Sequence, residues 1–363
     1  MDQQQAAKMS AKLDQQQVEK LAFRVIGDTS GAFTMALAYI GDRLGIFQAM
    51  AGAGPLTSEE LARKTGLQER YVREWLKAMV TSEYINYDPA AQKFMMTDEQ
   101  AFVLVNPDSP MYVGGLIQMG TPTTIHYNKL IEAFKHGGGV SYAELGPDVM
   151  EGTEKLFRTG YVNFLVSEWL PAVPGLVDKL KAGCEAVDIG CGAGQALIQM
   201  AKAFPNSRFT GIDNDAASIE KAKKNVAAEG VAERVKFIQF SADQVPANPK
   251  YDLICTFDCV HDMVNPRGAL KAIRQALKDD GVYFWTEPNA SERLEENINL
   301  LGRVFSTIST LHCMTVSLAL NGEGLGTVIG EGGARELAKE AGFSKFEKLP
   351  IDNPFNQFFA LRK

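Results

Sequence analysis

The segment at residues 185–213, EAVDIGCGAGQALIQMAKAFPNSRFTGID, constrains the fold more than any other part of the chain. Its apolar start predicts a short buried strand that runs directly into the glycine loop GCGAG. Apolar residues then recur at mostly three- and four-residue spacings, which predicts a helix that ends before Pro205. Residues 208–213 predict a second strand that ends on an acid. The order strand, glycine loop, helix, strand, acid is typical of the first half of a nucleotide-binding βαβ unit.

The residues of this segment have separate physical roles. Glycine has no Cβ, so a glycine loop can turn tightly and let its backbone approach a ligand. The N-terminus of the following helix offers free N–H groups and partial positive charge to an anionic group. Asp213, at the carboxyl end of the second strand, can accept hydrogen bonds from both hydroxyls of a ribose. We therefore expect a nucleoside cofactor to contact Asp188, Gly190, Gly192, Gly194, Asp213 and Asn214.

The glycine spacing distinguishes between cofactors. A dinucleotide loop has the pattern GxGxxG, but Gln195 occupies the sixth position here and the pattern is GxGxG. Asp188 precedes the first glycine by two residues. In these features the chain resembles the Rossmann-like (class I) S-adenosylmethionine (SAM) methyltransferases. The resemblance implies SAM as cofactor, S-adenosylhomocysteine (SAH) as product, and a mostly parallel α/β sheet that closes with an antiparallel hairpin. A turn with spare glycines and a NAD enzyme are the alternatives.

Composition limits the class of protein. The chain has 363 residues, a net charge of −7 and a pI of about 5.3, which argues against a large nucleic-acid surface. No apolar run approaches the ~20 residues of a membrane span, and the polar N-terminus does not resemble a signal peptide. The five cysteines form no CxxC pair, so we expect a cytoplasmic protein without a metal site.

The chain before residue 106 predicts a polar tail at 1–29 and a helical domain at 30–105. Within that domain, TSEE at residues 57–60 is a capping box that starts a short helix. A further helix at 68–80 precedes a hairpin around Asp88, and this order makes a winged helix. Up to Asp108 there are 11 Lys and Arg against 14 Asp and Glu, whereas DNA binding needs clustered cations. We interpret the domain as a dimerisation and lid module, which predicts a homodimer; a stability cap and a SAM-responsive DNA-binding regulator are the alternatives.

Residues 106–175 predict a helical connector, and residues 176–363 predict the SAM-binding methyltransferase domain. Further strands are expected at 235–240, 251–257 and 281–287, a long apolar helical insertion at 297–320, and a closing hairpin at 346–351 and 356–361. Ligands of open α/β sheets bind outside the carboxyl ends of the strands. The resemblance therefore implies that the adenine end of the cofactor lies near Ala242, Asp243, Gln244 and Phe257.

His261 follows the fourth predicted strand of this domain and is the candidate catalytic base. A neutral histidine suits proton removal from a hydroxyl near pH 7. The run VHDMVNPRGALKAIRQALKDDGVYFWTE is similar to that of bacterial small-molecule O-methyltransferases with an N-terminal winged helix, in which the histidine of a His-Asp pair is the base. This chain departs from them at Met263, where an aromatic residue is usual. We expect Glu287 to orient His261, and Tyr142, Asp262 and His312 to contact the acceptor; a structural histidine and core packing are the alternatives.

These features together predict a SAM-dependent methyltransferase acting on a small molecule. A hydroxyl is the favoured acceptor because of His261, while a thiolate needs little help from a base and an amine remains an alternative. The sequence does not identify the acceptor, since no motif marks the residues of its pocket.

Overall fold

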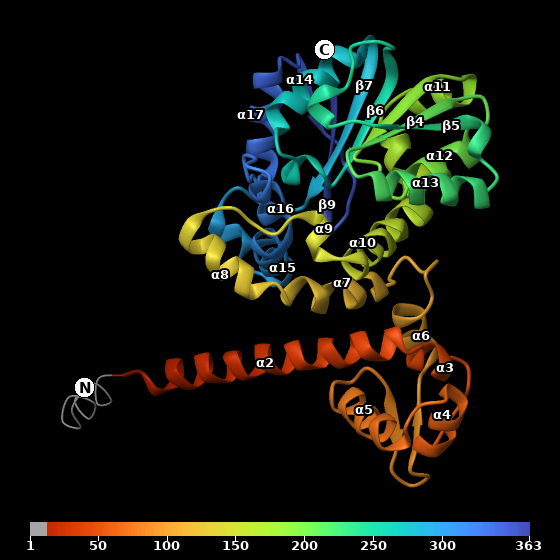
Figure 1. Cartoon of the computed structure of the whole chain (residues 1–363), viewed down its shortest axis with the longest axis vertical. Coiled ribbons are helices and arrows are strands. Elements are labelled where there is room, and N and C mark those ends of the chain that lie inside the picture. The colour runs from red at the N-terminus through yellow and green to blue at the C-terminus, as the bar shows by residue number, and fades with distance from the viewer. Residues whose placement is uncertain (1–12) are drawn as a thin grey trace. The chain divides into compact units, whose positions relative to one another are not determined.

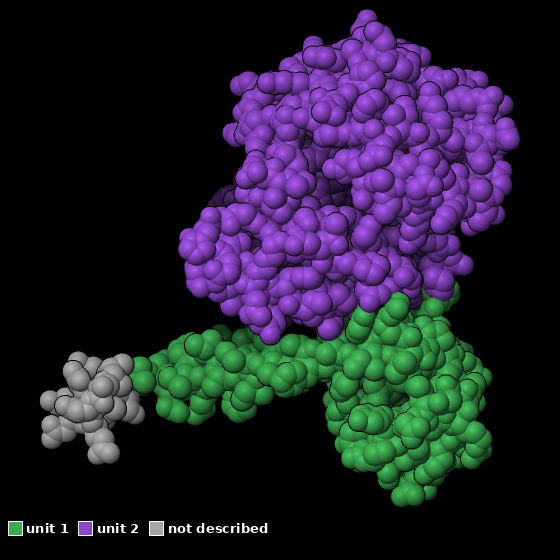
Figure 2. Space-filling view, in the orientation of Figure 1, with its two compact units in different colours: residues 1–106 green, residues 107–363 purple. Residues whose placement is uncertain are grey.

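The computed structural model describes residues 13–363, which form two compact units divided between Asn106 and Pro107 (Figure 2). Residues 1–12, part of the predicted polar tail, lie outside the described residues. No helix within residues 13–363 is both long enough and apolar enough to cross a membrane.

The first unit is a winged helix. Its elements are α2 (Gln15–Arg43), α3 (Ile46–Met50), α4 (Ser58–Thr65), α5 (Glu69–Thr81), β1 (Asn86–Asp88), β2 (Lys93–Met95) and α6 (Asp98–Leu104) (Figure 1). The predicted capping box is present: Thr57 Oγ1 accepts from the Glu60 N–H at 3.2 Å, and Glu60 Oε2 accepts from the Thr57 N–H at 2.8 Å. The strands β1 and β2 pair antiparallel as the wing.

The helix α2 begins inside the stretch predicted to be a tail. Asp14 caps it by accepting hydrogen bonds from the next turn, which gives the helix a defined start. Its carboxyl-terminal part packs on α5, where the Trp75 indole donates to the Leu37 carbonyl at 2.8 Å. A Cβ on Gly41 would come within 2.3 Å of the Trp75 ring, so glycine is required for this approach.

Cations on α5 are paired with acids of the same helix. Arg70 pairs with Glu74, and Arg73 Nε lies 3.2 Å from Glu69 Oε1. Lys77 Nζ lies 3.9 Å from Glu74 Oε2. This helix occupies the recognition-helix position of the winged helix, and its surface therefore has mixed charge rather than a cationic stripe.

The second unit is built on a seven-stranded sheet with the order β5-β4-β3-β6-β7-β9-β8. The neighbouring pairs from β5 to β7 are parallel, whereas β9 pairs antiparallel with both β7 and β8. The predicted mostly parallel sheet with a closing antiparallel hairpin is thereby confirmed. The strands are β3 (Glu185–Ile189), β4 (Arg208–Asp213), β5 (Val235–Gln239), β6 (Tyr251–Phe257), β7 (Leu277–Pro288), β8 (Lys345–Lys348) and β9 (Asn356–Arg362).

Helices cover both faces of this sheet. The elements that alternate with the strands are α11 (Leu176–Ala182), α12 (Gln195–Ala203), α13 (Ala216–Ala228), η3 (Ala232–Arg234), η4 (Ala242–Gln244), η5 (Val260–Asp262), α14 (Pro266–Ala276) and α17 (Gly330–Ala341). Figure 1 shows α14 and α17 on one side of the sheet and α11, α12 and α13 on the other.

The predicted connector and insertion form a helical layer of the same compact unit. Before the sheet come α7 (Gly114–Thr124), α8 (Tyr127–His136), α9 (Tyr142–Leu145), α10 (Pro147–Gly160), the π-helix η1 (Tyr161–Trp169) and η2 (Leu170–Ala172). After β7 come η6 (Leu294–Asn297), α15 (Leu300–Ile308), the π-helical turn η7 (Ser309–Cys313) and α16 (Met314–Ala319). Leu130, Leu145 and Val316 share one buried cluster, so the insertion packs against the segment predicted as a connector.

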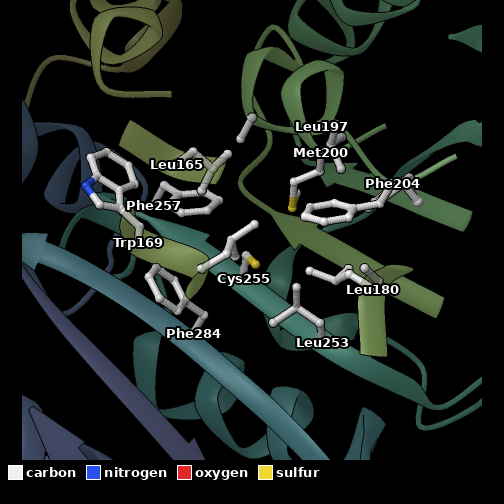
Figure 3. Packing of buried hydrophobic residues seen from close by; sticks show 14 of the residues in the cluster. Leu165, Trp169, Leu180, Leu197, Met200, Phe204, Leu253, Cys255, Phe257 and Phe284 are labelled. Carbon is white, nitrogen blue, oxygen red and sulfur yellow. The ribbon is translucent and has the colours of Figure 1, made fainter. Parts of the chain in front are cut away.

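Two apolar clusters fill the two faces of the sheet. Phe284 of β7 belongs to the same cluster as Leu197 and Phe204 of the α12 region (Figure 3), whereas Trp285 belongs to the other cluster with Leu270 of α14. This alternation follows from the two-residue period of a strand that is buried on both faces. Burial of a Phe or Leu side chain contributes about 1.5–3 kcal/mol, so these clusters hold rigid the strand ends that carry the polar residues.

Candidate functional site

The glycine loop between β3 and α12 has the conformation that its sequence predicts. Gly190, Gly192 and Gly194 have φ angles of 76°, 49° and 77°, in the left-handed region that favours glycine. A Cβ on Gly190 would lie 2.6 Å from Cys259 Sγ, whereas a Cβ on Gly192 would meet nothing within 4 Å. The loop therefore packs against the segment after β6 at Gly190 and leaves open space at Gly192.

Glu154 and Asn225 hold the glycine loop in place through hydrogen bonds from the helical layer and from α13. Glu154 of α10 accepts from Gln195 Nε2 at 2.7 Å and from Asn225 Nδ2 at 3.0 Å. Asn225 also donates to the Ala193 carbonyl at 3.0 Å. Sequence reasoning did not single out Glu154, because the contact joins residues that are far apart in the chain.

Asp213 lies at the end of β4 beside the loop, as predicted. Its Oδ2 accepts from the Gly192 N–H at 2.9 Å, and its Oδ1 accepts from the Asp215 N–H at 2.9 Å. Burial raises the pKa of Asp213 above its usual value, while these two backbone donors oppose the rise. A carboxylate oxygen has two lone pairs, so each oxygen can accept a further hydrogen bond from a hydroxyl. Asn214, the next residue, is exposed.

Asp188 of β3 is 2% exposed. Its Oδ1 has no hydrogen-bond partner within residues 13–363, and such a buried oxygen is costly unless a ligand pairs with it. Burial, with a smaller effect from Asp213, raises the pKa of Asp188 to about 8. An ammonium group bound here would be stabilised by the ionised carboxylate, which suits the amino group of an amino-acid-bearing cofactor.

The region predicted for the adenine lies after β5. Ala242, Asp243 and Gln244 form the single turn η4. Asp243 Oδ1 accepts from Ser241 Oγ at 2.5 Å, and Oδ2 accepts from Asn265 Nδ2 at 3.0 Å. Both oxygens thus have partners already, and the Ser241 hydroxyl, the largest contributor, lowers the pKa of Asp243.

Phe257 and Asp258, at the end of β6, come next along the carboxyl edge of the sheet, and sequence analysis did not single out Asp258 as a site residue. Phe257, which was predicted to lie near the cofactor, contacts the Tyr161 ring edge-on at a centroid distance of 5.2 Å. Asp258 follows it with a φ of 52°, which strains a residue with a side chain and is typical of functional sites. Its Oδ2 accepts from Asn356 Nδ2 at 2.5 Å, while its buried Oδ1 has no partner within the described chain. Burial, followed by repulsion from Glu287, raises the pKa of Asp258 to about 7.

His261 and Glu287 form a buried pair, as predicted. His261 Nδ1 lies 2.5 Å from Glu287 Oε2, and the two side chains are 3% and 0% exposed. The Trp285 indole donates to Glu287 Oε1 at 2.7 Å, so both carboxylate oxygens are engaged. Burial alone would lower the pKa of His261, but the Glu287 carboxylate holds that pKa well above its usual value. The pair comes from η5 and β7, two neighbouring segments at the carboxyl edge of the sheet.

The π-helical turn η7 brings further polar groups beside this pair. Cys313 Sγ lies 3.5 Å from His312 Nδ1, and the thiol is near enough to His261 to raise the pKa of that imidazole. The His312 ring meets the Tyr142 ring edge-on at a centroid distance of 5.7 Å. The structure therefore places His312 and Tyr142, both predicted to contact the acceptor, beside Cys313 and near His261. Burial raises the pKa of Asp262, the next residue after His261, to about 7.

Metal-ligating side chains do not converge in this region. Within residues 13–363 no three His, Cys, Asp or Glu side chains lie close enough to hold a metal ion. The site consists instead of a glycine loop, two acids at strand ends and a histidine–glutamate pair.

Family comparisons agree with this geometry. Residues 180–342 match the family described as "Methyltransferase domain", and residues 31–106 match the "Rv2258c-like winged HTH domain". The chain carries a methyltransferase domain behind a winged helix-turn-helix domain. These matches confirm the predicted methyltransferase fold and the predicted N-terminal winged helix, and methyl transfer is the class of activity that the first match supports.

Similar proteins include a curated sequence and solved structures. Polyketide synthase ThaQ of Burkholderia thailandensis is 33% identical over 95 residues, which cover 26% of this chain and 5% of that synthase. Among solved structures, mitomycin 7-O-methyltransferase MmcR has a TM-score of 0.72 and 19% identity, covering 96% of this chain and all of that one. Human N-acetylserotonin methyltransferase in complex with SAM has a TM-score of 0.71 and 17% identity, covering 97% and 99% of the two chains. These structural likenesses establish a shared fold.

Proposed function

We propose that this methyltransferase domain transfers the methyl group of SAM to a hydroxyl of a small molecule, with His261 as general base. The observation that carries the proposal is the buried His261–Glu287 pair at the same sheet edge as the glycine loop. Cys259, two residues before His261, lies against the glycine loop, because its Sγ would be 2.6 Å from a Cβ added to Gly190. A base and a cofactor site are thus neighbours.

The chain offers a group for each part of the cofactor. Asp213 is proposed to accept from the ribose hydroxyls, and the unpaired Oδ1 of Asp188 to pair with the amino group. The open space at Gly192 admits the cofactor against the backbone, with Asn214, the η4 turn and Phe257 nearest the adenine end. SAM, when bound, supplies an electrophilic methyl group on a positively charged sulfur.

His261 is proposed to take the proton of the acceptor hydroxyl. Because Nδ1 faces Glu287, the other ring nitrogen, Nε2, is the one available to the acceptor. Glu287 holds the ring in one orientation and stabilises the imidazolium that forms when the proton arrives. The raised pKa of His261 means that the base must first lose its own proton, so activity is expected to rise toward alkaline pH.

The winged-helix unit is proposed to make the protein a homodimer. The first half of α2 exposes large apolar side chains on several sides, with Leu21 66%, Phe23 70% and Ile26 61% exposed. Monomers rarely leave so many apolar groups together in water, and a second copy of the helix can cover them. The ion-paired cations of α5 argue against DNA as the partner, and all five cysteines are free, which fits a cytoplasmic protein.

The proposal is tested by methyl transfer from isotopically labelled SAM across a panel of small hydroxyl, thiol and amine acceptors. We expect a hydroxyl acceptor to be used by the wild-type protein and His261→Gln to lose about 10²–10⁴-fold in kcat while SAH affinity is retained. Full activity of His261→Gln would remove His261 as the base. Transfer only to thiols or amines would refute the hydroxyl assignment.

A further inference from the structure

One buried polar atom beside the base remains unexplained by methyl transfer alone. His312 is 5% exposed, and its Nε2 has no hydrogen-bond partner within residues 13–363. Its Nδ1 already contacts Cys313 Sγ, and its ring is held by the edge of Tyr142. A buried nitrogen without a partner costs about 1–3 kcal/mol, so its retention in a fixed ring points to a ligand that supplies the missing hydrogen bond.

The local backbone places this nitrogen next to the base. The segment from α15 to α16 is interrupted by the π-helical turn η7 (Ser309–Cys313), and such turns are frequent at functional sites. The Cys313 thiol lies 3.5 Å from His312 Nδ1, and Cys313 and His261 are near enough for each group to shift the pKa of the other. His261 also lowers the pKa of His312, so the two rings lie near each other and a single small molecule can reach both.

We propose that His312 binds a second, uncharged oxygen of the acceptor, adjacent to the hydroxyl that His261 deprotonates. The substrate class is therefore a molecule with two neighbouring oxygen substituents, such as a 1,2-dihydroxy or hydroxy-carbonyl compound. This inference rests on the proposed function, because it assumes that the methylated hydroxyl lies at His261.

The protonation state of His312 determines which kind of oxygen group on the acceptor it can bind. Burial, together with the nearby His261, lowers the pKa of His312 to about 4, so the ring is neutral near pH 7. A neutral ring gains little from a carboxylate, which would have to be desolvated without a cation to pair with. A hydroxyl can donate or accept, so it satisfies Nε2 in either tautomer, whereas a carbonyl requires the N–H form.

The test uses equilibrium binding of three probes to the full chain saturated with SAH: 1,2-dihydroxybenzene, its 1,4-isomer and phenol. The 1,4-isomer carries the same groups at the wrong spacing. We expect the wild-type protein to bind the 1,2-isomer roughly three- to tenfold more tightly than either of the others, the value of one neutral hydrogen bond. His312→Phe should abolish this preference, and His312→Gln, which keeps a distal polar group, should retain part of it.

The binding results distinguish a failure of the role of His312 from a failure of the proposed function. Equal affinity of the three probes for the wild-type protein, or no binding of any probe while SAH binds, would overturn the role of His312. An undiminished preference in His312→Phe would also overturn it. Failure of SAH itself to bind would instead refute the proposed function, and this inference with it. Measured SAH affinity in each variant shows that the cofactor site has folded.

Discussion

Glu287→Gln is expected to disable the base by changing its tautomer, although the substitution changes hardly any volume. In the wild-type protein one carboxylate oxygen of Glu287 faces His261 Nδ1 at 2.5 Å and the other accepts from the Trp285 indole at 2.7 Å. A glutamine has only one oxygen. If that oxygen accepts from Trp285, the amide N–H₂ faces His261 and Nδ1 must become the acceptor, which moves the ring proton to Nε2.

The magnitude follows from the two ways of placing the amide. The opposite orientation would point the amide donor at the indole donor, leaving two buried donors facing each other at a cost of about 1–3 kcal/mol. The orientation that satisfies Trp285 is therefore favoured by roughly 5- to 150-fold. Loss of the carboxylate also removes stabilisation of the imidazolium. Together these effects predict a fall in kcat/KM of about 10²–10⁴-fold.

The assay compares kcat/KM for the best hydroxyl acceptor among the wild-type protein, Glu287→Gln, Trp285→Phe and the double variant. Trp285→Phe removes the indole donor, so in the double variant the glutamine can turn its oxygen to His261. We expect the double variant to be about tenfold more active than Glu287→Gln. Wild-type activity in Glu287→Gln, or no rescue in the double variant, would refute the tautomer argument. Thermal unfolding controls for the cavity that Phe leaves at this buried position.

Three further predictions concern the cofactor loop. Asp213→Ala should weaken SAH binding by about 1.5–3 kcal/mol, the value of hydrogen bonds to a charged group; calorimetry that finds unchanged affinity would contradict the ribose assignment. In denaturant titrations, Gly190→Ala should lower the free energy of unfolding by about 1–3 kcal/mol more than Gly175→Ala does. Both glycines have a φ of 76°, but only at Gly190 would the added Cβ meet another side chain, at Cys259 Sγ. The raised pKa of Asp188, about 8, lies above its unfolded value, so this residue destabilises the ligand-free fold progressively as pH rises from about 4 to about 8. Asp188→Asn should therefore raise the thermal midpoint of the ligand-free protein more at about pH 8 than at about pH 5. Calorimetry in two buffers should also show that SAH binding releases fewer protons from the Asp188→Asn variant than from the wild-type protein. Equal midpoint changes at the two pH values would contradict this effect of Asp188.

Most of the strands of the sheet could be predicted, because the apolar pattern and the glycine positions of the sequence match the structure that tertiary packing requires there. The alternation of β7 around Phe284 and Trp285 serves two apolar faces, and the loop glycines require a left-handed backbone. The helix α7 was not predicted, since Gly114, Gly115 and Pro122 are poor helix formers. A Cβ on Gly115 would lie 2.5 Å from the Leu156 backbone nitrogen, so tight packing on α10 explains these residues.

The sequence could predict which candidate site residues lie together where a motif or a strand end marks them. Asp213 and Glu287 lie at the carboxyl ends of β4 and β7, and His261 follows β6, so their meeting point can be inferred from the order of elements. Asp258 differs from other polar loop residues only in its backbone strain, its burial and its unpaired oxygen, none of which a single sequence encodes visibly. Residues 297–320 were predicted as a long apolar helical insertion without the π-helical turn at Ser309–Cys313, because apolar spacing does not reveal the extra residue of such a turn.

Titration of SAH into the purified protein by calorimetry tests most directly whether a SAM site lies beside His261. We expect one-to-one binding with micromolar affinity that weakens in Asp213→Ala and persists in His261→Gln. An absence of binding, or an affinity indifferent to Asp213→Ala, would contradict the cofactor assignment and every site role that depends on it.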